Sequence, residues 1–200
     1  INDGEVTALA GSMAMGKNGV LGIAMGTSQG GGYIDMEGNI TTWLSELAFA
    51  PVDLHPEAPA DEWSGDLGCG AQYFSQQAVG RLLPASGIEY DETLKLPEQL
   101  KIVQALMEQG DERALKIYDA IGIYLGYSLA HYAEFYDYES VLLLGRVTSG
   151  PGGEHIIERS KEVMEAEFPD LAKRIKFHIP DETEKRHGQA IAAASLPKIS

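Results

Sequence analysis

The sequence predicts an α/β domain in which a mixed β-sheet is flanked by helices. Short apolar segments of strand length, the clearest being residues 20–25 and 140–145, are interspersed with longer segments that have helical periodicity. With 200 residues, of which 44% are hydrophobic, the chain is long enough to form one large domain with a single hydrophobic core. A single domain is therefore expected.

The first third of the chain is expected to form one helix followed by strands. The helix begins at Asn2 or Asp3, which are both good N-cap residues, and runs to about Met15. The expected strands are short, are separated by Gly and Asn turn residues, and cover residues 20–25, 32–36 and 40–43. The last two have the pattern of a β-hairpin. Residues 51–65 contain several prolines and predict a long irregular loop at the rim of a site.

The rest of the chain is expected to be mainly helical. The predicted helices share apolar residues at helical spacing and cover residues 70–83, 97–109, 112–135 and 154–168. Two further strands are expected, over residues 140–145 and 174–179. An alanine-rich closing helix is expected over residues 188–196.

The composition argues against several classes of function. Thirty acidic and fifteen basic residues give a formal charge of −15, which disfavours binding to nucleic acid or to an anionic membrane surface. Cys69 is the single cysteine, so neither an internal disulfide nor a metal site built on several cysteines can form. The five histidines lack the close spacing of a zinc site. Without a signal-peptide pattern or an apolar run of spanning length, the chain is expected to be cytoplasmic.

An acidic residue near the start of the chain and a glycine-rich segment together suggest phosphoryl transfer to a hydroxyl. That chemistry needs a base such as Asp3 for the hydroxyl proton and backbone amides around the phosphates, which Gly26–Gly32 can provide. Each feature also has a purely structural interpretation. Asn2 and Glu5 have the spacing of a helix capping box, and the glycines can form a flexible hairpin corner.

A second glycine pattern is rejected as a phosphate site. Residues 11–18 spell G-x-x-x-x-G-K, but Asn18 stands where a P-loop needs the Ser or Thr that holds magnesium. A P-loop also follows a strand and opens a helix, whereas these residues continue a predicted helix.

Four segments of the chain together resemble one known family. They are Asn2-Asp3 with Thr7–Gly11, Gly22–Gly32, Leu142–Gly145 and Gly188–Ala194. In this order they resemble the N-D segment, the second phosphate motif, the strand before the adenosine-side loop and the closing helix of the ROK family of sugar kinases and sugar-responsive repressors. The resemblance runs along nearly the whole chain. It implies a ribonuclease H-like lobe of the hexokinase, actin and Hsp70-like ATPase fold.

The resemblance implies an acceptor site for a sugar. Asp3 would be the general base on the sugar hydroxyl, Asn2 a sugar contact, and Glu46 a hydrogen-bond partner of sugar hydroxyls. A carboxylate base suits this chemistry, because a hydroxyl becomes a better nucleophile as its proton is accepted. Phe49 departs from the family, which has a histidine here that contacts sugar and zinc.

The segment around Cys69 departs from the family as well. Ala71 stands where the family has a second sugar-binding Glu, and the neighbouring Gln72 can substitute as a neutral hydrogen-bond partner. Of the family's cysteine motif for zinc only Cys69 is present, so zinc is not expected. These departures leave the choice of sugar open.

The resemblance also implies a nucleotide site. Phosphate contacts would come from the glycine-rich segment and are expected at Gly26, Thr27, Ser28 and Gly30. The loop that follows residues 140–145 would lie beside the adenosine, with contacts at Gly145 and Arg146. ATP is the expected donor, with Mg²⁺ carried by the nucleotide and no metal site on the chain.

Two functions are compatible with this sequence. Residues 1–200 would form one C-terminal lobe, and the N-terminal lobe with its first phosphate motif, D-x-G-G-T, is expected to lie outside this chain. The first function is ATP-dependent phosphorylation of a sugar hydroxyl, which the retained Asp3 favours. The alternative is a sugar-sensing, non-catalytic regulator domain, which the altered Phe49 and Ala71 favour. The expected partners are a sugar and a nucleotide, with a homodimer also considered.

Overall fold

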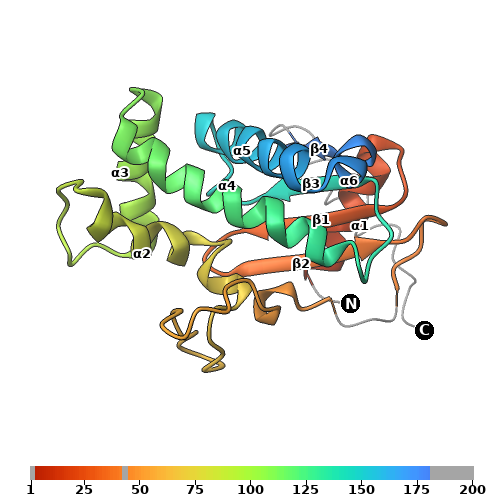
Figure 1. Ribbon diagram of the computed structural model, residues 1–200, viewed down its shortest axis with the longest axis horizontal. Coiled ribbons are helices and arrows are strands. Elements are labelled where there is room, and N and C mark those ends of the chain that lie inside the picture. Colours follow the sequence, from red (N-terminus) through yellow and green to blue (C-terminus); the bar gives the residue numbers. More distant parts are fainter. Residues whose placement is uncertain (1–2, 42–44, 181–200) are drawn as a thin grey trace, which may run out of the picture.

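A four-stranded mixed β-sheet organises the molecule (Figure 1). The computed structural model describes residues 3–41 and 45–180. The strands are β1 (Val20–Met25), β2 (Gln29–Ile34), β3 (Ser140–Leu144) and β4 (Lys176–His178), in the spatial order β2-β1-β3-β4. Strand β1 pairs antiparallel with β2 and parallel with β3, which in turn pairs parallel with β4. The predicted α/β class with a mixed sheet is confirmed.

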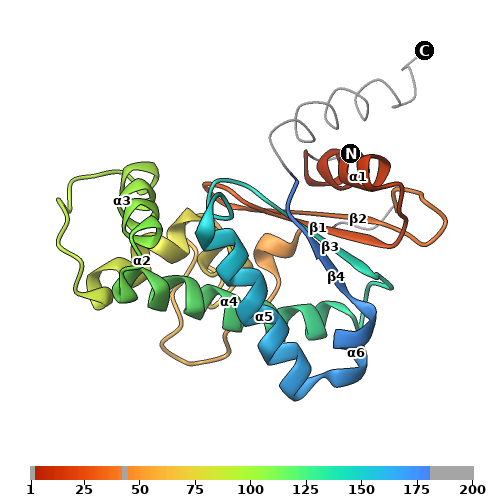
Figure 2. The same ribbon diagram turned by 90° about the horizontal axis from the view of Figure 1, so that it is seen from above.

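Helices cover both faces of this sheet (Figure 2). The helices are α1 (Asp3–Met15), α2 (Gln76–Ser86), α3 (Leu96–Glu108), α4 (Glu112–Tyr132), α5 (Pro151–Glu167) and α6 (Pro169–Arg174). Helix α1 lies on one face, and the long helices α4 and α5 lie on the other, as Figure 2 shows. Helices α2 and α3 pack together at one end of the molecule.

The central strands β1 and β3 are buried because both of their faces are covered. Their side chains alternate between two apolar clusters, as the two-residue period of a strand requires. Leu21 and Val141 belong to the larger cluster under α4 and α5. Val20 and Leu142 belong to the smaller cluster, which Ala8 of α1 completes. Continuous apolar runs of this kind are typical of strands covered on both faces.

The glycine-rich segment differs from its prediction. The strand expected over residues 32–36 begins at Gln29 and ends at Ile34, so most of the glycines lie inside β2 and only residues 26–28 form the turn. Pairing with β1 overrides the low strand propensity of glycine. The strand expected over residues 40–43 is reduced to one bridge, between Ile34 and Ile40, and residues 42–44 lie outside the described residues.

Several helix boundaries also differ. The helix expected over residues 70–83 is two elements, a 3₁₀ helix η2 (Gly70–Gln72) and then α2, whose N-cap Ser75 accepts a hydrogen bond from the Gln77 N–H. Helix α4 ends at residue 132 rather than 135, and α5 begins at Pro151 rather than residue 154, because proline suits the first turn of a helix.

Further along the chain, the unexpected short helix α6 shortens the strand predicted over residues 174–179 to β4. The loop predicted over residues 51–65 is irregular as expected, with isolated bridges at Pro51 and Ala60. The closing helix predicted over residues 188–196 lies outside the described residues.

Candidate functional site

The turn between β1 and β2 lies at the carboxyl end of β1. Thr27 and Ser28 are exposed at its tip. The Gly26 N–H donates to the Ser28 carbonyl at 3.0 Å and closes the turn, while the Gly26 carbonyl accepts from the Gln76 N–H at 2.8 Å. Because Gln76 is the first residue of α2, this bond fixes the turn against the N-terminus of that helix. We call residues 26–28 the phosphate turn.

The loop that follows β3 is fixed against the same turn. Gly145 has a φ of +95°, and a Cβ atom there would overlap the Met25 carbonyl, so the close approach requires glycine. The Val147 N–H donates to that Met25 carbonyl at 3.2 Å. Loops at the carboxyl ends of parallel strands are where open α/β sheets bind ligands. The phosphate turn and the N-terminus of α2 meet at this edge through the bond between Gly26 and Gln76, where the positive end of a helix dipole favours an anion.

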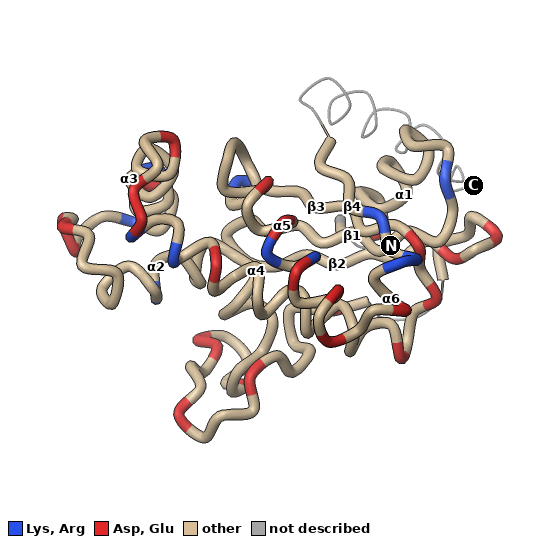
Figure 3. The backbone as a smooth tube through the Cα atoms, turned by 45° about the horizontal axis from the view of Figure 1, so that its top comes forward, with Lys and Arg blue, Asp and Glu red and all other residues tan. Residues whose placement is uncertain are grey.

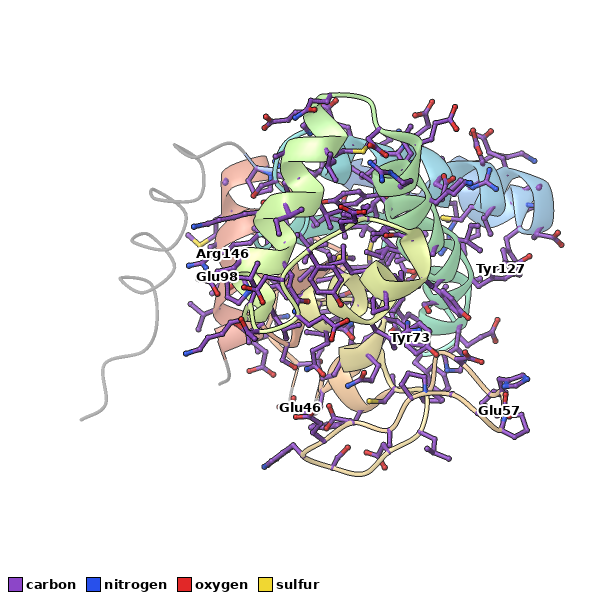
Figure 4. The ribbon with its side chains drawn as sticks, turned by 90° about the vertical axis from the view of Figure 1, so that its left-hand side faces the viewer. Glu46, Glu57, Tyr73, Glu98, Tyr127 and Arg146 are labelled. Atoms are coloured by element: carbon purple, nitrogen blue, oxygen red, sulfur yellow. The ribbon has the colours of Figure 1, made fainter. Side chains whose placement is uncertain are left out.

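Arg146 lies on this loop with its side chain exposed. Its carbonyl accepts a hydrogen bond from Gln104 Nε2 of α3 at 2.8 Å, which fixes the backbone from the neighbouring helix. Figure 4 shows Arg146 beside α3, with Glu46 lower down near the long irregular loop. The predicted adenosine-side residues and the predicted sugar-side Glu46 therefore occupy separate parts of the site.

The glycines of β2 bring the start of α1 and a second 3₁₀ helix, η1 (Leu47–Phe49), onto opposite faces of the strand. A Cβ atom on Gly32 would overlap the carbonyl of Gly4 in the first turn of α1. A Cβ atom on Gly31 would lie 2.8 Å from Leu47 Cγ and 2.9 Å from the Ser45 carbonyl oxygen. These approaches are closer than a side chain permits. The glycine-rich pattern therefore serves packing, a role that the interpretation as a flexible hairpin corner did not include.

Two of the predicted acceptor segments contact the same residue of β2 from opposite faces. Asp3 is the first residue of α1 and directly precedes Gly4, whereas Glu46 is exposed between Ser45 and Leu47. Both segments therefore meet at Gly31 of β2. Asn2 and the side chain of Asp3 lie outside the described part of the structure.

Gln72 lies on η2 and is 6% exposed. Its Nε2 donates to Gln77 Oε1, and its carbonyl accepts from Arg81 Nη2 at 3.3 Å. The predicted sugar contact therefore has its amide engaged by the start of α2.

Comparisons with known proteins identify the fold. No protein-family model matches the chain. A glucokinase of Halalkalibacterium halodurans is 28% identical over 193 residues. A ROK family glucokinase from Streptomyces griseus, solved in complex with glucose and AMPPNP, superposes with a TM-score of 0.73 at 20% identity and covers 95% of this chain. The chain has the fold of the ROK sugar kinases.

The likeness to ROK proteins that the sequence predicted is confirmed. A ROK family transcriptional regulator, a homologue of the E. coli MLC protein, also superposes with a TM-score of 0.73, at 18% identity and over 96% of this chain. The match covers 89% of this chain but only 57% of the Halalkalibacterium glucokinase, 66% of the Streptomyces structure and 50% of the regulator. This chain thus corresponds to part of each relative.

An aromatic pair, which sequence reasoning missed, lies beside the acceptor segments of this ROK fold. The Phe49 ring of η1 is 5.6 Å from the ring of Trp63, and the two planes are tilted by 34°. Trp63 is 84% exposed. Phe49 and Glu46 also line a cavity of about 710 Å³ between η1 and the C-terminal end of α4. Trp63 sits in the predicted irregular loop, so no periodic pattern in the sequence connects it to Phe49.

The long loop between η1 and η2 is fastened to the core by Asp53. Its Oδ2 accepts hydrogen bonds from Tyr73 at 2.7 Å and from Tyr124 of α4 at 3.2 Å. The Tyr73 hydroxyl, followed by the His55 N–H, lowers the pKa of Asp53. Burial, followed by the hydrogen bond to Asp53, raises the pKa of Tyr73. The loop carries acidic residues and no Lys or Arg (Figure 3). The hydroxyls of Tyr73 and Tyr124 therefore stabilise the Asp53 carboxylate by hydrogen bonding, without a cation from the loop itself.

The described residues offer no metal cage of their own. Within residues 3–41 and 45–180, no group of three or more His, Cys, Asp or Glu side chains is placed to hold a metal ion. Cys69 is buried, and this burial raises the pKa of its thiol. Over the same residues, no helix combines the length and apolar character needed to cross a membrane.

Proposed function

We propose that this chain is the C-terminal lobe of an ATP-dependent sugar kinase. One observation carries the proposal: the phosphate turn directly precedes β2, and the Asp3 and Glu46 segments meet at Gly31 of that strand. At about 3.4 Å per residue, Ser28 and Gly31 are about 10 Å apart along that strand. A triphosphate that extends from the turn toward Gly31 would therefore bring its terminal phosphate to a sugar held there.

In this proposal, Asp3 is the general base. Its carboxylate accepts the proton of the sugar hydroxyl while the hydroxyl oxygen bonds to the γ-phosphorus and the bond from that phosphorus to ADP breaks. Asn2 and Glu46 hold the sugar through its other hydroxyls. Charge that develops on the phosphoryl oxygens is stabilised by the backbone N–H groups of Thr27 and Ser28 and by the positive end of the α2 helix dipole.

ATP is the donor that we propose, supported by the AMPPNP in the Streptomyces glucokinase. The donor set at the turn fits an anion, because it consists of backbone amides and the exposed hydroxyls of Thr27 and Ser28. Mg²⁺ would arrive with the nucleotide and would neutralise part of the phosphate charge. The N-terminal lobe, with the first phosphate motif, would close the cleft from the other side. We place this protein in the cytoplasm, where ATP is available.

A second function has one observation in its favour. The ROK transcriptional regulator superposes as well as the Streptomyces glucokinase does, with a TM-score of 0.73 in each case. Phe49 and Ala71, which replace polar residues of the family pattern, agree with a domain that binds sugar without turnover. The experiment must therefore separate binding from catalysis.

The decisive experiment measures ADP release by the full-length protein with Mg-ATP and a panel of hexoses and amino sugars. We expect turnover on one sugar, and a decrease of about 10²–10⁴-fold in kcat for Asp3→Asn. The control is Asp170→Asn, because Asp170 has a side chain that is 97% exposed on α6. It should retain full activity.

Thermal unfolding with each sugar distinguishes the two functions. If a sugar raises the Tm of the wild-type protein and no ADP is released, the kinase proposal is wrong and the sensor is supported. If Asp3→Asn turns over at the wild-type rate, Asp3 is not the base.

A further inference from the structure

The side chain of Gln29 connects three parts of the site. Gln29 is the first residue of β2, directly after the phosphate turn, and is 6% exposed. Its carboxamide faces two backbone carbonyls, one from Leu47 in η1 and one from Gly70 in η2. Because carbonyl oxygens only accept hydrogen bonds, the amide nitrogen is the atom that faces them, at 3.3 Å from Leu47 and 3.1 Å from Gly70.

Two glycines make room for this arrangement. A Cβ atom on Gly70 would overlap both the Gln29 carboxamide and the Leu47 carbonyl. On the strand itself, Gly31 lies two residues after Gln29 and therefore on the same face of β2. Its close approach to Leu47 means that η1 rests on the strand at two successive positions. Gln29 supplies the polar contact and Gly31 supplies the space.

We propose that Gln29 is a positioning residue that holds the acceptor-binding elements η1 and η2 in a fixed place relative to the phosphate turn. This inference rests on the proposed kinase function. Helix η1 carries Phe49 and directly follows Glu46, and η2 carries Gln72. Without the Gln29 amide, the carbonyls of Leu47 and Gly70 keep only their local backbone partners and lose the hydrogen bonds that connect η1 and η2 to β2. Both 3₁₀ helices are then free to shift.

The phosphate turn does not depend on the same contact. The Gly26 N–H bonds to Ser28, and the Gly26 carbonyl accepts from Gln76, with no part taken by the Gln29 side chain. A change at Gln29 should therefore weaken the acceptor site and leave the nucleotide site intact. A residue that merely stabilises the fold would affect the two substrates alike.

The test compares Gln29→Met with a matched control, Gln99→Met, in the full-length protein. Gln99 also donates a hydrogen bond from its amide to a backbone carbonyl, that of Leu94 at 2.8 Å, but it lies on α3. Steady-state kinetics give kcat and both KM values, and thermal unfolding gives Tm. For Gln29→Met we expect the KM for the sugar to rise about tenfold, or 1.4 kcal/mol, with the KM for ATP within about twofold of wild type. Gln99→Met should change neither KM.

Two further variants keep the proposal testable if Gln29→Met does not fold. Gln29→Asn retains the amide but is one methylene shorter, so it should raise the KM for the sugar by a smaller factor. Gly70→Ala places a methyl group against the same carboxamide from η2 and should reproduce the selective loss. The proposal is overturned if the folded variants change both KM values equally, or change neither.

ADP release and sugar binding by the wild-type protein distinguish a failure of this inference from a failure of the proposed function. If it releases no ADP but a sugar still binds, the kinase proposal alone is wrong, and the dissociation constant of that sugar replaces KM in the comparison of variants. If no sugar binds, both proposals are overturned.

Discussion

The phosphate turn and the acceptor side of the site are built by different means. At the phosphate turn, the contacts that we propose come largely from backbone amides, with the hydroxyls of Thr27 and Ser28 beside them, and glycines such as Gly145 let segments approach closely. On the acceptor side, the groups are side chains carried by η1, η2 and the long loop between them. Backbone amides are the same in every sequence, whereas side chains change with substrate. The difference explains why the departures from the family, Phe49 and Ala71, lie on the acceptor side.

The largest effect is expected where glycine serves packing rather than binding. Gly32→Ala would place a Cβ atom against the backbone of Gly4 and Glu5, which cannot move without shifting α1. We expect the free energy of unfolding to fall by about 3 kcal/mol, at the upper end for an overpacked core. Urea unfolding monitored by circular dichroism measures this change.

Gly30→Ala is the matched control for Gly32→Ala. It lies on the same face of β2, but a Cβ atom there would meet Ala24 Cβ at an ordinary distance of 3.5 Å. Its stability should stay within about 0.5 kcal/mol of wild type. Equal losses in the two variants would show that the glycines matter for strand flexibility and not for the approach of α1.

The second effect concerns the attachment of the acceptor loop. Asp53→Ala leaves the hydroxyl of Tyr73, a residue that is 2% exposed, without its acceptor. We expect a loss of about 2 kcal/mol in the free energy of unfolding, by the usual cost of an unsatisfied buried group. Asp91→Ala is the control, because Asp91 bonds only to the exposed, local Thr93. A loss no larger than that of Asp91→Ala would contradict the role given to Asp53.

The same contact predicts a pH dependence. Because hydrogen bonds lower the pKa of Asp53 below 3.8, the folded state favours the carboxylate. The stabilisation is therefore complete above pH 3.8 and is lost as the pH falls through the lower folded pKa. Unfolding of wild type and Asp53→Ala measured from pH 7 downward should give two curves that converge in acid.

The sequence predicted the central strands and the long helices because their signals are local. Residues 20–25 and 140–144 are continuous apolar runs, and α3 and α4 have apolar positions at helical spacing. The beginning of β2 was predicted wrongly, because glycines favour turns in isolation and only pairing with β1 places them in a strand. Local pattern determines an element, whereas its boundary depends on its neighbour in the sheet.

Only part of the candidate site could be predicted from the sequence, for the same reason. The phosphate turn has a sequence pattern, since its residues are consecutive. The contact of Asp53 with Tyr124 joins residues 71 positions apart and has no such pattern. The carboxamide of Gln29 likewise reaches Leu47 and Gly70, which only the folded chain brings together. Side-chain contacts between distant segments therefore had to come from the structure.

A moderate effect is expected at the phosphate turn. Thr27→Val keeps the shape of the exposed Thr27 side chain but removes its hydroxyl, so the KM for ATP should rise about tenfold, or 1.4 kcal/mol. Thr27→Ser retains the hydroxyl and should stay near wild type. The KM for the sugar should be unchanged in both. A rise of the KM for the sugar in Thr27→Val would mean that the phosphate turn and the acceptor side of the site are not independent.

The smallest effect is expected at Trp63, whose side chain is 84% exposed. Trp63→Ala should change the free energy of unfolding by less than about 0.5 kcal/mol, as is usual for an exposed position. Leu54→Ala is the control, because Leu54 is 88% exposed on the same loop but is not paired with Phe49. If the aromatic pair contacts the sugar, Trp63→Ala raises the KM for the sugar by about threefold, or 0.6 kcal/mol, and Leu54→Ala does not. If the two variants have the same KM, the pair is only part of the loop, and sugar recognition is confined to η1, η2 and the start of α1.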